Sequence, residues 1–155
     1  MTSSDILIYF LFQNTYRMSK MYSAPRMRLT SVNQPAENGF SPLYVACHRG
    51  HKEVAELLLR AGASVNHCDE NGFTPLYVTC YGGHKEVAQL LLDAGASVNH
   101  CDEDGVTPLY VACQEGHKEV AQLLLVARAS VDQPNENGNT PLMMAATEGH
   151  CGIAR

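Results

Sequence analysis

Cysteine and histidine are the residues of this chain best suited to chemistry, since thiolates and imidazoles act as nucleophiles, bases and metal ligands. The 155 residues include six cysteines and seven histidines. Two adjacent pairs, His67-Cys68 and His100-Cys101, offer four ligands in principle. However, adjacent residues point in different directions, the pairs stand 33 residues apart, and no C-x-x-C spacing occurs. We therefore expect no metal ion and no other cofactor.

Catalytic arrangements are equally hard to find. Cys47-His48 with His51 is as weak a metal site as the two pairs. A Cys–His nucleophile stays open as an alternative, but no unique, non-repeated constellation stands out. Tyr81-Gly82-Gly83-His84 lacks the Lys-Ser/Thr that follows a phosphate-binding glycine loop. We predict that the chain is not an enzyme.

Most of these residues recur because the chain repeats itself every 33 residues. The stretch 72–92 reappears at 39–59 and at 105–125, and a broken fourth copy begins at Thr140. Such a period decides the architecture before any single motif does. Cys47, Cys80 and Cys113 share one position, and stacked units would separate them by about 8 to 10 Å, beyond disulfide reach. We interpret them as small buried packing residues.

Each unit contains the start and stop signals of two helices, as its second copy shows. Asn71-Gly72 predicts a turn, and Thr74-Pro75 predicts a helix start with a hydroxyl cap and an early proline. A second helix with an apolar stripe follows from His84, and Gly95 ends it in the left-handed conformation. The histidines expected to fix the turn between the helices are His51, His84, His117 and His150. No unit can bury its stripe alone, so neighbouring units must stack.

The repeated text resembles the ankyrin repeat, with Thr-Pro-Leu, Gly-His, Leu-Leu-Leu, Gly-Ala and Val-Asn at a period of 33 residues. The resemblance covers about residues 31–155 and implies an all-α solenoid of stacked helix-turn-helix units with β-turn fingers. It places three full repeats at about 36–68, 69–101 and 102–134, and a truncated fourth at 135–155. It also implies a protein-binding module without catalysis of its own, acting through the concave face that the fingers and first helices form.

Residues 1–30 do not show the repeat text, and we expect a degenerate repeat or a poorly ordered segment there. The apolar run Ile6–Phe12 is far too short to span a bilayer, and its flank Met1–Asp5 lacks the basic residues of a secretory signal. The net charge is -5, and a basic segment over 1–32 precedes an acidic array. Acidic arrays do not suit nucleic-acid binding. We expect a cytoplasmic protein, with the nucleus as the alternative, and no membrane insertion.

Three features depart from the ankyrin pattern. The family has histidine after Thr-Pro-Leu, and the residues at this position are Tyr44, Tyr77, Tyr110 and Met143. Arg128 replaces the capping glycine of the third unit, which costs on the order of 1 kcal/mol. The fourth unit stops at Arg155, so its second helix would be a stub over 149–155, leaving Leu124 and Leu125 partly uncovered. The chain therefore looks like a piece of a longer array.

The predicted partner-binding residues vary within an otherwise copied frame, either after the turn glycine or at the end of the first helix. They are Phe40, His48, Arg49, Phe73, Tyr81, Val106, Gln114, Glu115 and Asn139. The two phenylalanines and Tyr81 are the expected anchors, because exposed aromatic side chains dominate interface energetics. The alternative is that the phenylalanines pack on neighbouring fingers. An acidic row at the finger tips favours a basic partner; its members are Glu37, Glu70, Glu103 and Glu136.

The sequence thus predicts a monomeric, non-catalytic module for protein–protein interaction, without naming the partner. One alternative is a fragment of a larger scaffold or of a ubiquitin-ligase substrate adaptor, whose other functions would need residues outside this chain. The family resemblance also implies that Asn66 and Asn99 could be substrates of an asparaginyl hydroxylase. Ser64 and Ser97 replace the acidic residue usual before Val-Asn, which weakens that alternative.

Overall fold

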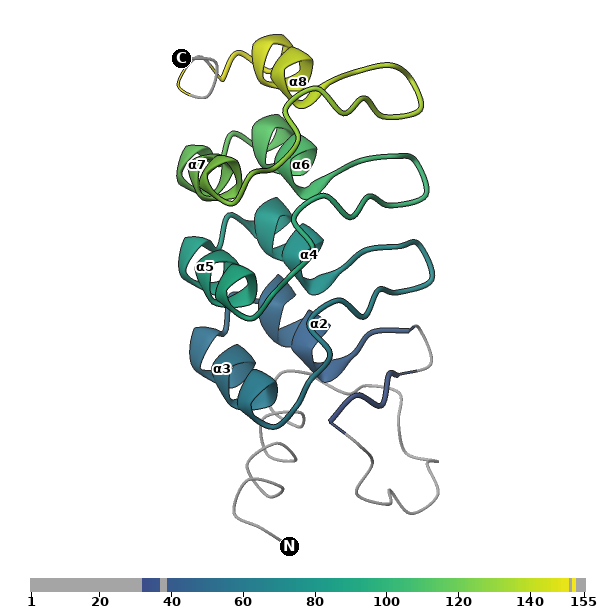
Figure 1. Ribbon diagram of the computed structural model, residues 1–155, viewed down its shortest axis with the longest axis vertical. Coiled ribbons are helices and arrows are strands. Elements are labelled where there is room, and N and C mark those ends of the chain that lie inside the picture. Colours follow the sequence, from purple (N-terminus) through teal and green to yellow (C-terminus); the bar gives the residue numbers. More distant parts are fainter. Residues whose placement is uncertain (1–31, 37–38, 151, 153–155) are drawn as a thin grey trace, which may run out of the picture.

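The computed structural model describes residues 32–36, 39–150 and 152, which form a stack of helical layers (Figure 1). The helices are α2 (Pro42–His48), α3 (Lys52–Arg60), α4 (Pro75–Gly82), α5 (Lys85–Asp93), α6 (Pro108–Gln114), α7 (Lys118–Val126) and α8 (Pro141–Thr147). Three layers are the antiparallel pairs α2/α3, α4/α5 and α6/α7, and α8 lies on the last of them. The described part contains no strand, so the expected all-α stack of helix pairs is confirmed.

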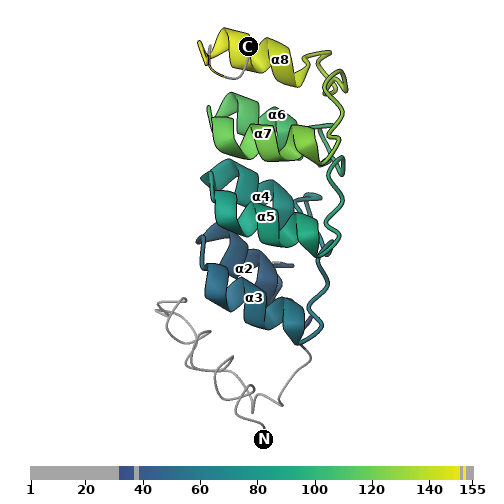
Figure 2. The same cartoon turned by 60° about the vertical axis from the view of Figure 1, so that its left-hand side comes forward.

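Each layer packs on its neighbours through equivalent helices. The first helices α2, α4, α6 and α8 form one column, and the second helices α3, α5 and α7 form another. The view turned by 60° shows the same order, with the layers one above another (Figure 2). The loops between layers project as fingers from the N-terminal ends of the first helices, away from the second helices (Figure 1).

The first helices begin where the hydroxyl residue and proline predict. The hydroxyl oxygen of Thr74 accepts a hydrogen bond from the backbone N–H of Tyr77 at 3.2 Å, and Pro75 follows in the first turn. The same cap recurs at Ser41, Thr107 and Thr140. These hydroxyls satisfy a backbone donor that a helix end would otherwise leave unpaired.

The second helices begin one residue later than expected. His51, His84 and His117 are the N-caps, but none of their side chains caps the helix, and the first helical residue is the lysine that follows. Each histidine's backbone carbonyl accepts the first intrahelical bond, as from Ala88 to His84 at 2.9 Å. The imidazole is thereby left free for contacts outside its own unit.

The imidazoles join one layer to the previous one, which differs from the turn-fixing role expected for them. Nε2 of His84 donates to the carbonyl oxygen of His48 (3.3 Å), and Nε2 of His117 donates to that of Tyr81 (3.1 Å). His150 repeats this contact with Gln114 at 3.0 Å. The ring of His117 lies so close to Gly83 that a Cβ there would be 2.6 Å from it. Only glycine therefore permits the contact.

An asparagine in each connector makes a second bridge between layers. Oδ1 of Asn66 accepts from the backbone N–H of Ser97 (2.8 Å), and its Nδ2 donates to the carbonyl of Gly95 (3.4 Å). Asn33 binds the next connector in the same two ways, and Asn99 accepts from Ser130 at 2.8 Å. A side chain of one unit thus satisfies backbone groups of the next.

The core runs continuously through the stack. Leucines of the first and second helices are almost fully buried; they are Leu43, Leu58, Leu76, Leu91, Leu109 and Leu124. The prediction that Leu124 is partly uncovered was therefore wrong, since its exposed fraction is 0%. It belongs to the buried core, whereas Leu125 is 42% exposed as expected.

Two sequence expectations lie partly or wholly outside the described residues. The segment 1–30 lies outside them, and so does most of the stub helix expected over 149–155. The repeat boundaries proposed from the sequence place one finger and one helix pair in each of the three full units.

Arg128 occupies the left-handed position that glycine holds in the other units. Its φ is 65°, and it is the one non-glycine residue with positive φ in the described part of the chain. The equivalent Gly62 and Gly95 have φ of 88° and 87°, and no neighbouring atom lies within 4 Å of the point that a Cβ would occupy there. The cost at Arg128 is therefore backbone strain rather than a steric clash.

Replacing Arg128 with glycine should stabilise the protein by up to about 1 kcal/mol, because the left-handed backbone no longer carries a Cβ. The reciprocal variant, Gly95→Ala, should lose about the same amount. Urea unfolding of both variants beside the wild type measures the two changes. A stability of Arg128→Gly at or below that of the wild type would contradict this account of the turn.

Candidate functional site

The fingers are turns held by the side chain of a single residue. Oδ1 of Asp69 accepts from the backbone N–H groups of Asn71 and Phe73, both at 2.9 Å. Asp102 and Asn135 hold the next two fingers in the same way. Aspartate and asparagine suit this role because their short side chains reach backbone groups two residues on.

Sequence reasoning missed these finger residues, although a signal was present. An aspartate or asparagine stands three residues before the turn glycine in each of the second, third and fourth units. That position is the one from which such a side chain closes a turn. Reading Asn71-Gly72 alone predicted the turn but not the residue that stabilises it.

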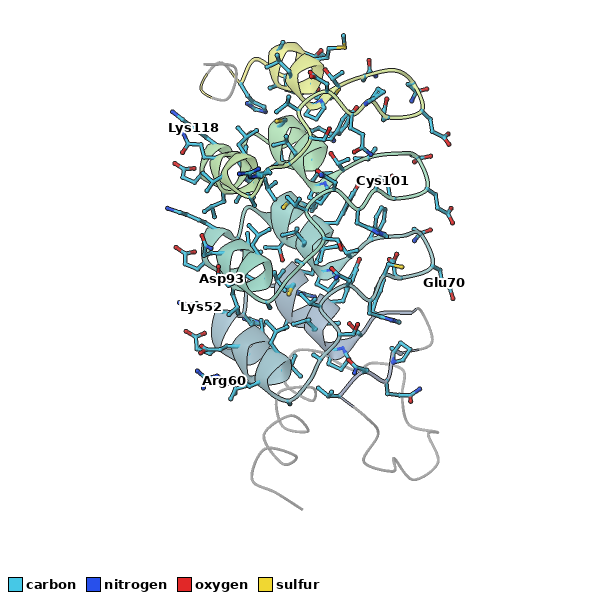
Figure 3. The ribbon with its side chains drawn as sticks, viewed as in Figure 1. Lys52, Arg60, Glu70, Asp93, Cys101 and Lys118 are labelled. Carbon is cyan, nitrogen blue, oxygen red and sulfur yellow. The ribbon has the colours of Figure 1, made fainter. Side chains whose placement is uncertain are left out.

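Neighbouring fingers also pair with each other. The backbone N–H of Glu103 donates to the carbonyl of Asn71 (3.4 Å), and that of Glu136 donates to the carbonyl of Asp104 (2.9 Å). Glu70 lies at the outer end of its finger (Figure 3), and Glu70, Glu103 and Glu136 are all exposed. The acidic row is therefore present on three aligned fingers, while Glu37 lies outside the described residues.

Phe40 and Phe73 each stack on a tyrosine of their own unit. The ring of Phe40 stacks on Tyr44 with centroids 4.5 Å apart, and Phe73 stacks on Tyr77 at 4.6 Å. Both phenylalanines are half-buried against the core. The pairing accounts for the tyrosine that departs from the ankyrin pattern: a flat ring there gives the finger aromatic a surface to stack on.

The tyrosines also face the finger of the following unit. Burial, and then the carboxylate of Asp69, raise the pKa of Tyr44 to about 12. Oδ2 of Asp69 is buried, so little water screens its charge from that hydroxyl. Burial and Asp102 likewise raise the pKa of Tyr77. In the third unit the Tyr110 hydroxyl accepts from Nδ2 of Asn135 at 3.3 Å.

The other predicted partner-binding residues divide by exposure. The side chains at the ends of the first helices are exposed; they are His48, Arg49, Tyr81, Gln114 and Glu115. Tyr81 is 54% exposed, which makes it the one large aromatic side chain in the described residues that is mostly open to solvent. Val106 packs partly on the core, and the backbone of Asn139 is held by Asn135. These two residues support the fingers.

The exposed residues follow one line along the stack. His48 and Arg49 end α2, Tyr81 lies near the end of α4, and Gln114 and Glu115 end α6. Because the first helices form one column, these ends succeed one another on the same side of the molecule (Figure 1). The arrangement offers an elongated surface with the positive side chain of Arg49 at one end and the negative side chain of Glu115 further along it.

The three thiols of the first helices are buried and unreactive. Cys47, Cys80 and Cys113 are buried and free. Burial raises the pKa of Cys47 to about 12 and that of Cys113 to about 11, so both stay protonated and unreactive at neutral pH. Their interpretation as packing residues is confirmed by their burial in the core. In the described chain no three histidine, cysteine or acidic side chains gather closely enough to hold a metal ion.

The comparison with known families agrees with this geometry. A model of ankyrin repeats, three copies long, matches residues 7–102 and again residues 94–155. The chain belongs to the ankyrin repeat family. A search of curated protein sequences finds no match to this chain.

Membership of the family carries a general function. Ankyrin repeats are generally modules for protein–protein interaction, and the family is typically non-catalytic. The described helices have seven to nine residues, and none could cross a membrane.

The aromatic residues should separate into structural and surface groups. Phe73→Ala should destabilise the protein by about 2 kcal/mol, because it removes a half-buried ring and its stacking contact with Tyr77. Tyr81→Ala should stay within about 0.5 kcal/mol of the wild type, since its ring is mostly exposed. Urea unfolding measures both. Equal losses would mean that the exposed ring also supports the fold.

Alkaline pH should weaken the fold through the buried tyrosines and cysteines. Tyr44 has a pKa of about 12 in the folded state against its ordinary 10.0, and Cys47 about 12 against 9.0. Folding thus favours the protonated forms, so stability is full below pH 9.0 and falls as the pH rises toward about 12. Unfolding free energies across this range test the loss. Tyr44→Phe should flatten the upper part of the curve, and a flat wild-type curve would be the contrary result.

Proposed function

We propose that this chain binds a partner protein along the concave face that its fingers and first helices form. The proposal rests on one observation: the exposed positions at the ends of the first helices are also positions at which the units differ in sequence. The exposed ends of the first helices read His48-Arg49, Tyr81-Gly82, Gln114-Glu115 and Thr147-Glu148 in successive units. Surface residues that packing leaves unconstrained, and that differ from unit to unit, are suited to specific recognition.

The starts of the second helices, away from the fingers, show a different pattern (Figure 3). The exposed starts of the second helices are the same Lys-Glu pair in three units; these are Lys52-Glu53, Lys85-Glu86 and Lys118-Glu119. Lys52 and Lys118 lie at the edge formed by α3 and α7, away from the fingers (Figure 3). A copied surface cannot distinguish one point of a partner from the next. It serves as the reference surface for experiments on the concave face.

The expected partner is an extended segment with basic residues and one apolar or aromatic anchor. Tyr81 supplies a mostly exposed ring at the middle of the line, where an interface places its anchors. Glu70, Glu103 and Glu136 are exposed on the fingers that lead into the first helices. Their carboxylates raise the association rate of a basic partner, and salt screens that attraction.

The proposed setting is the cytoplasm or the nucleus, without catalysis by the chain itself. All five described cysteines are free thiols, as in a reducing compartment. The chain acts by holding a partner, and any enzymatic step would belong to the partner. A scaffold or adaptor is the class of protein in which such a module is useful.

Affinity capture from a cell lysate, with the wild type beside an Arg49→Ala, Tyr81→Ala double variant, tests the placement of the site. Both side chains are exposed, so the variant should fold normally while losing its specific partners. Capture should also weaken as the salt concentration rises.

The matched control is Gln89→Ala with Gln122→Ala, two exposed positions on α5 and α7 away from the fingers. This variant should keep every specific partner. If the concave-face variant keeps them as well, or if the control loses them, the site lies elsewhere.

A further inference from the structure

The charges at the ends of the first helices follow an order along the stack. Arg49 is the C-cap of α2, whereas Glu115 and Glu148 are the C-caps of α6 and α8. Between them, α4 ends in Gly82, which has no side chain. All four positions are exposed. The line of helix ends therefore changes from positive to negative once, and the change falls at the unit that contributes Tyr81.

The other exposed charges near this line do not cancel the order. The Lys-Glu pair at the start of the second helix is the same in three units, so it adds no difference between them. The fingers add to the order, because the second unit exposes Glu70 on its finger and the third exposes Glu103 and Asp104. These side chains belong to the same face at the other end of the first helices. The negative potential of the face therefore increases from α2 toward α6.

Tyr81 stands where the sign changes, beside bare backbone. A Cβ on Gly82 would lie 2.5 Å from Nε2 of His84, so the imidazole takes the space that a side chain would need there. The other units carry a charged side chain at this position, but here an aromatic side chain that is 54% exposed has only glycine next to it. This place suits an apolar side chain of a partner, which would bury the tyrosine ring without displacing a charge.

We propose that the partner is an extended peptide segment whose charges have a fixed order, with an acidic residue at Arg49, an apolar residue at Tyr81 and a basic residue at Glu115. This inference rests on the proposed binding at the concave face. A guanidinium binds a carboxylate through two parallel hydrogen bonds, and the carboxylate of Glu115 accepts from lysine or arginine. The reverse order would bring like charges together at both ends. The surface therefore selects one orientation of the segment along the stack.

The stacking distance sets the spacing of these residues in the partner. Packed helices lie about 8 to 10 Å apart and an extended chain advances about 3.3 Å per residue, so each layer corresponds to about three partner residues. Because α4 lies between α2 and α6, the acidic and basic residues should stand about six positions apart, with the apolar residue halfway between them. A second basic residue about three positions further on would reach Glu148.

Selection from a displayed library of random peptides tests this order on the full 155-residue chain. Peptides of about twelve residues suffice, since they span about 40 Å when extended. The enriched peptides should share an acidic and a basic residue about six positions apart, with an apolar or aromatic residue between them. A synthetic peptide with the consensus sequence then serves as the probe, and fluorescence anisotropy measures its affinity.

Charge exchange assigns each end of the probe to one end of the line. Arg49→Glu should weaken the probe about three- to tenfold, and replacing the acidic residue of the probe with lysine should restore the affinity. Glu115→Arg should weaken it by a similar factor, and replacing the basic residue of the probe with glutamate should restore it. Neither change in the probe should rescue the other variant.

The matched control is Asp93→Arg, a charge reversal at the end of α5 and away from the fingers (Figure 3). It installs the residue that α3 carries at the same position, Arg60, so the fold accommodates it. The affinity of the probe should stay within about twofold of the wild type. Thermal melts of all variants confirm that they fold.

Three results would overturn the proposal: no enriched peptides, enriched peptides without a common order of charges, or a probe whose affinity Glu115→Arg leaves unchanged. A failure of the proposed function would look different. In that case the probe would bind the Arg49→Ala, Tyr81→Ala double variant as tightly as the wild type. Loss of binding in the double variant with no effect of Glu115→Arg would keep the concave site and reject the order of charges.

Discussion

The structure depends on the contact between one helical layer and the next. A single helix pair has seven to nine residues in each helix, far too few to be stable in water alone. The apolar stripes therefore have to be buried between layers, and each of the helices α2 to α7 contributes a buried leucine. Two polar bridges fix how the layers sit: an imidazole of one layer donates to a carbonyl of the previous layer, and an asparagine binds the following connector.

That constraint explains why most of the chain is copied. Gly83 must be glycine because the ring of His117 lies against it, and His117 must reach the carbonyl of Tyr81. Such copied residues are needed for the contact with the neighbouring layer, so few of the repeated residues are free to bind a partner. The residues that remain free lie at the ends of the first helices and at the finger tips. These are the surfaces to which the proposal on partner binding applies.

Features encoded within one unit could be predicted from the sequence. Thr74-Pro75 is a local helix start, and the strain at Arg128 follows from the glycine it replaces, so both appear in the structure as expected. Contacts between units were harder to predict. The hydrogen bond of the His117 side chain and the burial of Leu124 depend on neighbouring helices. The roles predicted for both residues therefore needed correction.

The candidate site was predicted in part. The ends of the first helices are exposed as expected, with Tyr81 the most open aromatic residue there. Phe73, predicted as a second anchor, also stacks on Tyr77, and this contact was not predicted. The 33-residue period could not reveal the stacking of Phe73 on Tyr77. These two residues are four positions apart, and whether their rings meet depends on the path by which the finger returns to the helix. Asp69, which shapes that return, went unrecognised for the same reason.

The dependence of every layer on its neighbour is tested most directly by chemical unfolding of His117→Ala beside His100→Ala. Both variants remove one half-buried imidazole, but only His117 donates to the previous layer, whereas His100 makes no side-chain hydrogen bond within the described residues. The account predicts a loss of about 1 to 3 kcal/mol for His117→Ala, because the Tyr81 carbonyl loses its donor. It predicts a loss within about 0.5 kcal/mol for His100→Ala. Equal losses in the two variants would contradict the account.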